Sequence, residues 1–103
     1  MTAGYVEVDA DPVSVSNARV GDLLVDPVDG TEIGRIVVRE PDRIKALLAI
    51  DDHPRRTAAW DTAQLDLTRP ALPCTGVLRR HFVEAGLRAP PVLEIMRLAK
   101  ARR

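Results

Sequence analysis

Short runs of apolar residues separated by turn-forming residues mark the middle of the chain, from Val20 to Ile50. The turn signals are Asp26 to Gly30 and Pro41 to Arg43. Pro fixes φ there, and Asp-Gly supports the positive φ angles of a tight reversal. Apolar runs of this length between turns are typical of β-strands. We therefore predict three strands: one that begins with Leu23 to Val25, then Ile33 to Arg39 and Ile44 to Ile50.

Two positions in this stretch need separate treatment. Strict alternation fails once, between Ile33 and Ile36, and Gly34 lies at the failure, which predicts a β-bulge or a sharp bend there. Ala and Leu favour a helix from Lys45 to Ile50 as the competing interpretation. Seven residues between two turn signals favour the strand instead.

The flanking residues extend this predicted sheet. Tyr5 to Val8 alternates and could form a short strand. After a polar, Pro-containing loop, Thr57 to Trp60 and Gln64 to Leu67 have the length and composition of a fourth and a fifth core strand. Together these runs predict a small antiparallel β-barrel of five to six strands over residues 1–68.

The pattern changes beyond this point. Two prolines exclude a regular helix or a central strand from residues 69–74, which we interpret as a Pro-rich extended connector. Thr75 is a suitable N-cap for a helix from Gly76 to about Ala85. Gly86 fits the left-handed residue that commonly ends a helix, so this helix has both a start and a stop signal.

A second helix is predicted after Pro90-Pro91, because Pro is tolerated in a first helical turn. Four apolar residues then recur at helical spacing and form a candidate docking stripe: Val92, Ile95, Met96 and Ala99. The predicted fold class is therefore α+β. A five- to six-stranded antiparallel β-barrel (1–68) is followed by the connector (69–74) and two C-terminal α-helices, a basic helical pair (75–103).

Charge divides the chain although the formal net charge is zero. Residues 1–68 carry 13 acidic and 7 basic side chains, whereas residues 69–103 carry 2 acidic and 8 basic ones. Such asymmetry is typical either of a basic end that meets nucleic acid or of surfaces that meet each other. A solvated helix face rich in Arg, complementing the helix dipole, explains it equally well. The candidate contacts with a partner or a phosphate are Arg79, Arg80, Arg88, Arg97, Lys100, Arg102 and Arg103.

Residues that could support catalysis or hold a cofactor do not form a recognisable motif. Asp51, Asp52 and His53 invite a metal hypothesis, but three neighbours in one loop do not supply ligands that converge from separate elements. A solvated turn is the favoured interpretation. No phosphate-binding Gly-rich loop with its Lys is present. We therefore expect neither enzyme activity nor a cofactor or metal.

Two further residues bear on chemistry. Cys74 is the single cysteine, which excludes an internal disulfide and fits a reducing, cytoplasmic compartment or a particle assembled inside a cell. We interpret it as a structural thiol. Trp60 is predicted to anchor one end of the barrel, with its indole N–H donating to a carbonyl or water. Stacking on a ligand is the functional alternative. We see no signal peptide and no apolar run of membrane-spanning length.

The segment from Val20 to Ile50 resembles the opening of PRC-barrel domains. The resemblance depends on Val20-Gly21-Asp22, the turn at Gly30 and the run Ile33-Gly34-Arg35-Ile36, which leads into the next apolar strand. It covers about a third of the chain. It implies a small β-barrel that acts as a non-catalytic docking module.

Three functions follow as hypotheses. The first is an interaction or assembly module that docks on a larger protein or nucleoprotein, or on itself, through the barrel and the basic helical arm. The second is nucleic-acid binding by the Arg-rich helices, with an affinity that falls steeply with salt. The third is a structural component of a virus particle or another large assembly. Neither a membrane nor a small-molecule substrate is indicated.

Overall fold

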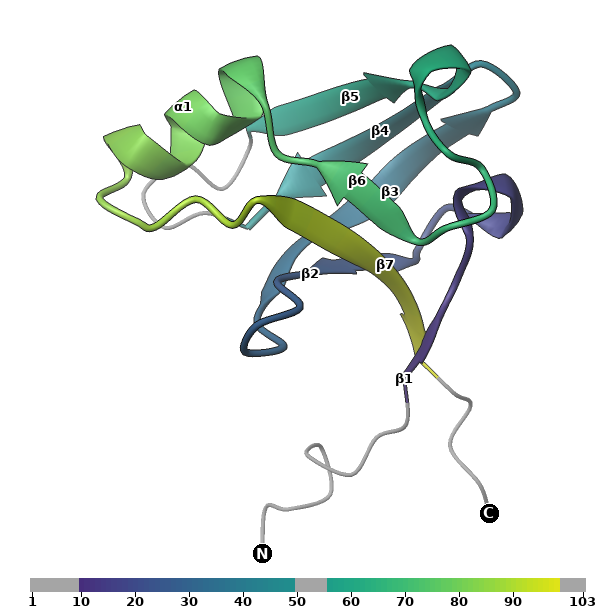
Figure 1. Cartoon of the computed structure of the whole chain (residues 1–103), viewed down its shortest axis with the longest axis horizontal. Coiled ribbons are helices and arrows are strands. Elements are labelled where there is room, and N and C mark those ends of the chain that lie inside the picture. The colour runs from purple at the N-terminus through teal and green to yellow at the C-terminus, as the bar shows by residue number, and fades with distance from the viewer. Residues whose placement is uncertain (1–9, 50–55, 99–103) are drawn as a thin grey trace, which may run out of the picture.

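The computed structural model describes residues 10–49 and 56–98, which form one sheet with one α-helix packed against it (Figure 1). The described strands are β1 (Ala10–Pro12), β2 (Leu23–Val25), β3 (Glu32–Glu40), β4 (Arg43–Leu48), β5 (Thr57–Asp61), β6 (Ala71–Pro73) and β7 (Val92–Leu98). The helix is α1 (Gly76–Glu84), and two short 3-10 turns are η2 (Val15–Asn17) and η3 (Thr62–Gln64).

The sheet is antiparallel, with strand order β1-β7-β2-β3-β4-β5. β1 and β6 lie on the same side of β7: β1 pairs with its C-terminal half, and β6 pairs with its N-terminal half. The last strand therefore lies in the middle, between β2 on one side and β1 and β6 on the other. At the far end, β5 pairs with β4 alone among the described strands. The sheet is open, so the prediction of a closed barrel was wrong.

The predicted second C-terminal helix is also wrong, because Val92–Leu98 is the strand β7. Leu93 and Ile95 alternate with half-buried residues and are fully buried. The sequence fits a strand, with a period of two residues, and also a helix, because Val92, Ile95 and Met96 recur at helical spacing. Pairing decides between them: β1, β2 and β6 all bond to β7, so its backbone groups gain partners from three strands.

The first predicted helix is confirmed, at Gly76–Glu84. Thr75 stands at its N-cap in an extended conformation, without a side-chain capping bond. At the other end Gly86 has φ +74°, its N–H donates to the Val83 carbonyl, and the N–H of Leu87 donates to the Phe82 carbonyl. This pair of bonds is the Schellman motif that the glycine predicted. None of the described helices is long and apolar enough to cross a membrane.

The predicted strands of the central stretch are confirmed as β2, β3 and β4, and Thr57 to Trp60 is confirmed within β5. The predicted fifth strand, Gln64 to Leu67, is wrong. The Asp61 carboxylate accepts from the N–H of Ala63 and starts η3, and Asp66 accepts from the N–H and hydroxyl of Thr68. These local side-chain bonds offer the backbone an alternative to a ladder. The Tyr5 to Val8 strand lies outside the described residues.

A β-bulge lies where the alternation of the second run fails, as predicted. Leu24 pairs with Gly34, but Val25 pairs with Glu32, so β3 has one extra residue, Ile33, at this point. Both Ile33 and Gly34 are buried in consequence. A second register shift in β3 leaves Val37 as an extra residue opposite β4.

The core lies between the concave face of the sheet and α1. Phe82 and Leu78 of α1 and the ring of Trp60 are buried in it. The sheet contributes aliphatic side chains, namely Leu24, Ile33, Ile36, Ile44, Ala46, Leu48, Leu72, Leu93 and Ile95. Since strands from before and after the Pro-rich segment supply this set, one core joins both parts of the described chain.

Candidate functional site

The outer edge of β5 offers backbone hydrogen-bonding groups that no described strand uses. The N–H of Leu48 donates to the carbonyl of Arg56, and the N–H of Thr62 donates to the carbonyl of Asp42. In an antiparallel pair the bonded residues alternate, so Ala58 also directs its backbone groups toward β4. The intervening residues, Thr57 and Ala59, therefore direct their N–H and C=O groups away from the sheet.

This edge borders a groove between β5 and the first turn of α1. Figure 1 shows α1 beside the start of β5. Thr57 to Trp60 line one side and Thr75 to Leu78 line the other, and the hollow measures about 360 Å³. We call it the β5 groove. Its size lies at the lower end of the range of peptide and ligand sites.

The side chain of Trp60 connects β5 to β6. Its indole N–H donates to the carbonyl of Pro73 in β6 at 2.9 Å, and its ring is buried. The prediction that this indole reaches a carbonyl is confirmed. The side chain thus holds β5 beside β6 although their backbones do not pair.

The two ends of β5 differ in charge. Beside the C-terminal end of β5, Asp42 and Asp61 are exposed, and the nearby Glu40 is neutralised by Arg43 at 2.9 Å. Beside the N-terminal end, Arg56 bonds to Glu84 and to a ring nitrogen of His81. The larger excess of charge is therefore negative and lies at the Asp61 end.

The basic residues predicted to contact a partner do not form one cluster in the described part of the chain. Arg79 and Arg80 are exposed on α1. Arg88 follows α1 and lies 3.7 Å from the carboxylate of Asp26. Arg97 belongs to β7. Lys100, Arg102 and Arg103 lie outside the described residues.

The predicted apolar stripe is divided between the two faces of the sheet. Ile95 is completely buried in the core, whereas Val92 and Met96 lie on the opposite face, as alternation along β7 requires. Met96 pairs with Leu23 of β2 there. Ala99 lies outside the described residues. A strand therefore replaces the single helical face on which docking was predicted.

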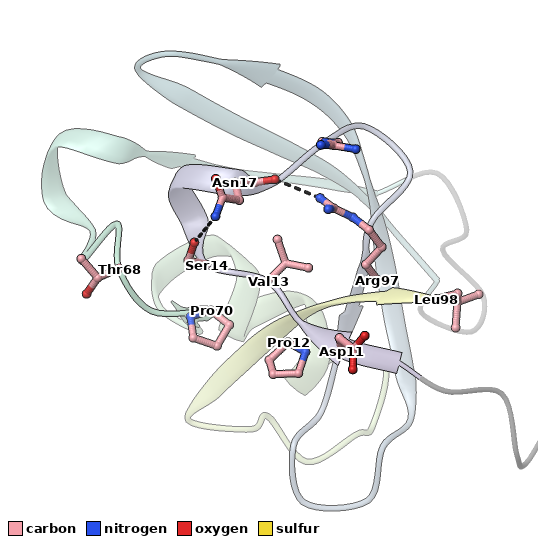
Figure 2. A pocket seen from close by; sticks show the side chains of 10 residues that line it. Asp11, Pro12, Val13, Ser14, Asn17, Thr68, Pro70, Arg97 and Leu98 are labelled. Atoms are coloured by element: carbon pink, nitrogen blue, oxygen red, sulfur yellow. Dashed lines mark hydrogen bonds between the residues drawn. The ribbon is translucent and has the colours of Figure 1, made fainter. Parts of the chain in front are cut away.

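Arg97 is held inside the fold by Asp22, beside a larger hollow of about 930 Å³ (Figure 2). Its Nε and Nη2 donate to the two carboxylate oxygens of Asp22 at 2.8 Å each, and Nη2 also donates to the carbonyl of Asn17 at 2.9 Å. Asp22 accepts a further bond from the N–H of Arg19. The guanidinium in this hollow is thus already occupied by the protein's own groups.

The ionisation of Asp22 reflects these contacts. Burial raises the pKa of this carboxyl, but the hydrogen bonds from Arg97 and Arg19 and the charge of Arg97 outweigh burial, so the pKa lies below its ordinary value of 3.8. The pKa of Arg97 is raised in turn, chiefly by its hydrogen bonds to Asp22. The pair is therefore a structural clamp between β7 and the entry to β2.

The other residues considered for chemistry are placed as follows. Cys74 is buried, and burial raises the pKa of its thiol, so its thiolate is disfavoured. Among the described residues, no group of three His, Cys, Asp or Glu side chains could hold a metal ion. The loop segment Asp51 to His53, where a metal was considered, lies outside those residues.

The β5 groove was missed at the level of sequence. Thr57 to Trp60 was predicted as a strand, but nothing in four residues says whether a strand is central or at an edge. The one signal in the sequence was composition: Thr57, Ala58 and Ala59 have small side chains, which leave room for another segment beside the strand. That signal gains meaning only once the position of β7 assigns β5 to the end of the sheet.

Hydrogen exchange should distinguish the two kinds of amide in β5. We expect the amides of Thr57 and Ala59 to exchange quickly, because they face the groove. The amides of Ala58 and Trp60 should exchange at least about a hundredfold more slowly, because opening the ladder costs free energy. Residue-resolved exchange followed by NMR would show the alternation. Equal protection of Ala58 and Ala59 would mean that the outer edge is already paired.

The sequence and the fold were compared with those of known proteins. No protein-family model, curated protein sequence or solved structure matches this chain.

Proposed function

We propose that this protein is a non-catalytic protein-interaction module that binds an extended segment of a partner protein as an added strand along β5. The observation that carries the proposal is the pair of outward-facing backbone positions, Thr57 and Ala59, beside a groove. Strand addition draws its affinity from main-chain hydrogen bonds, and pockets for alternate side chains supply specificity. An unused sheet edge is otherwise a liability that proteins tend to cover.

The form of the groove supports a single peptide segment as the occupant. Thr75 to Leu78 stand opposite the strand edge, so an added strand would contact β5 on one side and α1 on the other. The resemblance of residues 20–50 to PRC-barrel domains also favours a docking role without catalysis.

The clamp on Arg97 bears on the choice between a peptide and a nucleic acid as partner. Asp22 and the Asn17 carbonyl occupy its guanidinium, and Asp26 lies near Arg88. Phosphate binding needs several free cations acting together. On the described part of the chain, Arg79 and Arg80 remain as exposed neighbours. We therefore favour the peptide.

Replacing Ala59 with Pro should abolish binding while leaving the fold intact. Pro removes the N–H that faces the groove and no bond to β4, and edge strands tolerate Pro at such positions. Peptides selected from a displayed random library on the native protein would serve as probes. We expect the substitution to weaken their binding at least tenfold, as measured by fluorescence anisotropy.

A matched variant separates this effect from loss of structure. Ala58→Pro removes a ladder bond to β4 instead, so it should lower the free energy of unfolding by about 2 kcal/mol. Ala59→Pro should retain the circular dichroism spectrum and nearly the melting temperature of the native protein. A library that yields no binder, or binders indifferent to Ala59→Pro, would overturn the proposal.

A further inference from the structure

The α1 side of the β5 groove carries apolar surface that the described chain leaves uncovered. Val77, in the first turn of α1, lines the groove and is 60% exposed, whereas its neighbour Leu78 is buried. Ala58 of β5 also lines the groove; it is half-buried and packs against the core. A single exposed apolar residue is ordinary on a protein surface. Val77 differs because it stands beside a strand edge with unused backbone groups, so an occupant of that edge would also cover it.

The hollow lies at the edge of β5 and reaches the face of the sheet that packs against α1. Side chains alternate along a strand, so Ala58 and Trp60 point to this inner face, and Thr57 and Ala59 point to the outer face. All four residues line the hollow together with the first turn of α1. Because the two pairs share only the strand edge, the hollow runs along that edge, with α1 on its inner side.

An added strand would continue the same alternation. Two residues that lie directly opposite each other in a sheet point to the same face, with Cβ atoms about 4.5–5.5 Å apart. A partner residue opposite Ala58 therefore points to the α1 side, where Val77 and Leu78 line the groove. The residues on either side of it, opposite Thr57 and Ala59, point to the outer face, where both of these residues are exposed. The small side chain of Ala58 leaves room for a larger one at the opposite position.

We infer that the groove selects an extended partner segment in which apolar residues alternate with polar ones. The inference rests on the proposed function, because it names the class of peptide that adds to β5. The apolar side chains lie on the same face as Ala58 and cover Val77, and the polar side chains lie in solvent on the outer face. Valine suits the apolar positions because it favours strands. Apolar burial on this one face supplies the selectivity, since the main-chain bonds are the same for every sequence.

The test compares two labelled peptides of identical composition, KTVTVTK and KTTVVTK, by fluorescence anisotropy. The two valines of the first share one face of an extended strand, whereas those of the second point to opposite faces. The native protein should bind the first about fivefold more tightly, because only this peptide places both valines on the α1 side. The preference should persist in about 1 M salt, because salt screens charges and not apolar contacts.

Two variants of α1 test whether Val77 is the source of the preference. Val77→Ser should reduce it to about twofold or less, because a hydroxyl group replaces apolar surface. Val83→Ser is the matched control: Val83 is 65% exposed on the same helix and is not among the residues that line the groove, so this variant should keep the preference. Both sites are exposed, and Ser and Val have similar helix propensities, so both variants should retain the circular dichroism spectrum of the native protein.

The outcomes separate the two levels of the proposal. Equal binding of both peptides, lost on Ala59→Pro, would overturn the apolar preference and leave strand addition in place. A preference that Val77→Ser leaves unchanged, or that Val83→Ser reduces equally, would also overturn it. If neither peptide binds in a way that Ala59→Pro weakens, strand addition along β5 fails as well.

Discussion

Replacing Arg97 with Met should lower the free energy of unfolding by about 3 kcal/mol. The change leaves the carboxylate of Asp22, which is only 5% exposed, without its cation. Removing one partner from a buried ion pair costs about 3–5 kcal/mol. Because the Arg97 side chain is 34% exposed, we expect the lower end of that range. Urea unfolding monitored by the fluorescence of Trp60, the single tryptophan, would measure the loss.

Arg79→Met is the matched control, because Arg79 is exposed on α1 and its side chain forms no hydrogen bond or ion pair in the described structure. Its effect should stay within about 0.5 kcal/mol. Asp22→Asn should destabilise the protein as well, and the double variant should lose less than the sum of the two. Additive losses would show that the two residues do not act as a pair.

The cost of Arg97→Met should depend on pH in a defined direction. Asp22 has a pKa below 3.8 in the folded protein, so it contributes stability above its unfolded pKa. That contribution is lost as pH falls through the folded value. We therefore expect the difference between native protein and variant to be full at pH 6 and to shrink below about pH 4. A difference that stays constant down to pH 2 would contradict the clamp.

Gly34→Ala should lower the free energy of unfolding by about 2–3 kcal/mol. A Cβ at this position would lie 2.6 Å from the carbonyl oxygen of Leu47 and 3.3 Å from the Cα of Leu48. Both are backbone atoms of β4, so the two strands would have to move apart at the bulge. Forcing extra atoms into a packed site costs about 1–3 kcal/mol. Thermal and urea unfolding would give the value.

Arg35→Ala provides the control in the same strand. Arg35 follows Gly34, is exposed and forms a surface ion pair with Glu32 at 3.3 Å. Such pairs contribute about 0–1 kcal/mol, so this variant should remain close to native stability. If Gly34→Ala proved as mild as Arg35→Ala, the close approach of β3 and β4 would not be a constraint on the fold.

Local signals in the sequence were sufficient for much of the sheet and for α1. Asp-Gly and Pro-Asp turns separate β2, β3 and β4, and these reversals are properties of a few adjacent residues. Gly34 marked a bulge because a failure of alternation and a missing side chain coincide there. Gly86 marked the end of α1 because only a few residues adopt positive φ readily. Each of these predictions needed no knowledge of distant partners.

The candidate site could not be predicted in the same way. Whether Thr57 and Ala59 face another strand or solvent depends on which strand ends the sheet, and that depends on the position of β7. The role of Arg97 depends on Asp22, which lies 75 residues earlier in the chain. A charge count therefore placed Arg97 with the free cations, although Asp22 and the carbonyl of Asn17 bind its guanidinium.

The sequence by itself determined the turns, the central strands, the bulge and the first helix, because these follow from the conformational preferences of neighbouring residues. Only the tertiary structure decided that Val92–Leu98 is a strand, since its apolar residues satisfy two periods and long-range pairing alone distinguishes them. That one choice places β7 inside the sheet and leaves β5 at its edge. The physical reason is that a backbone gains its hydrogen-bond partners from whichever strands the rest of the chain brings beside it.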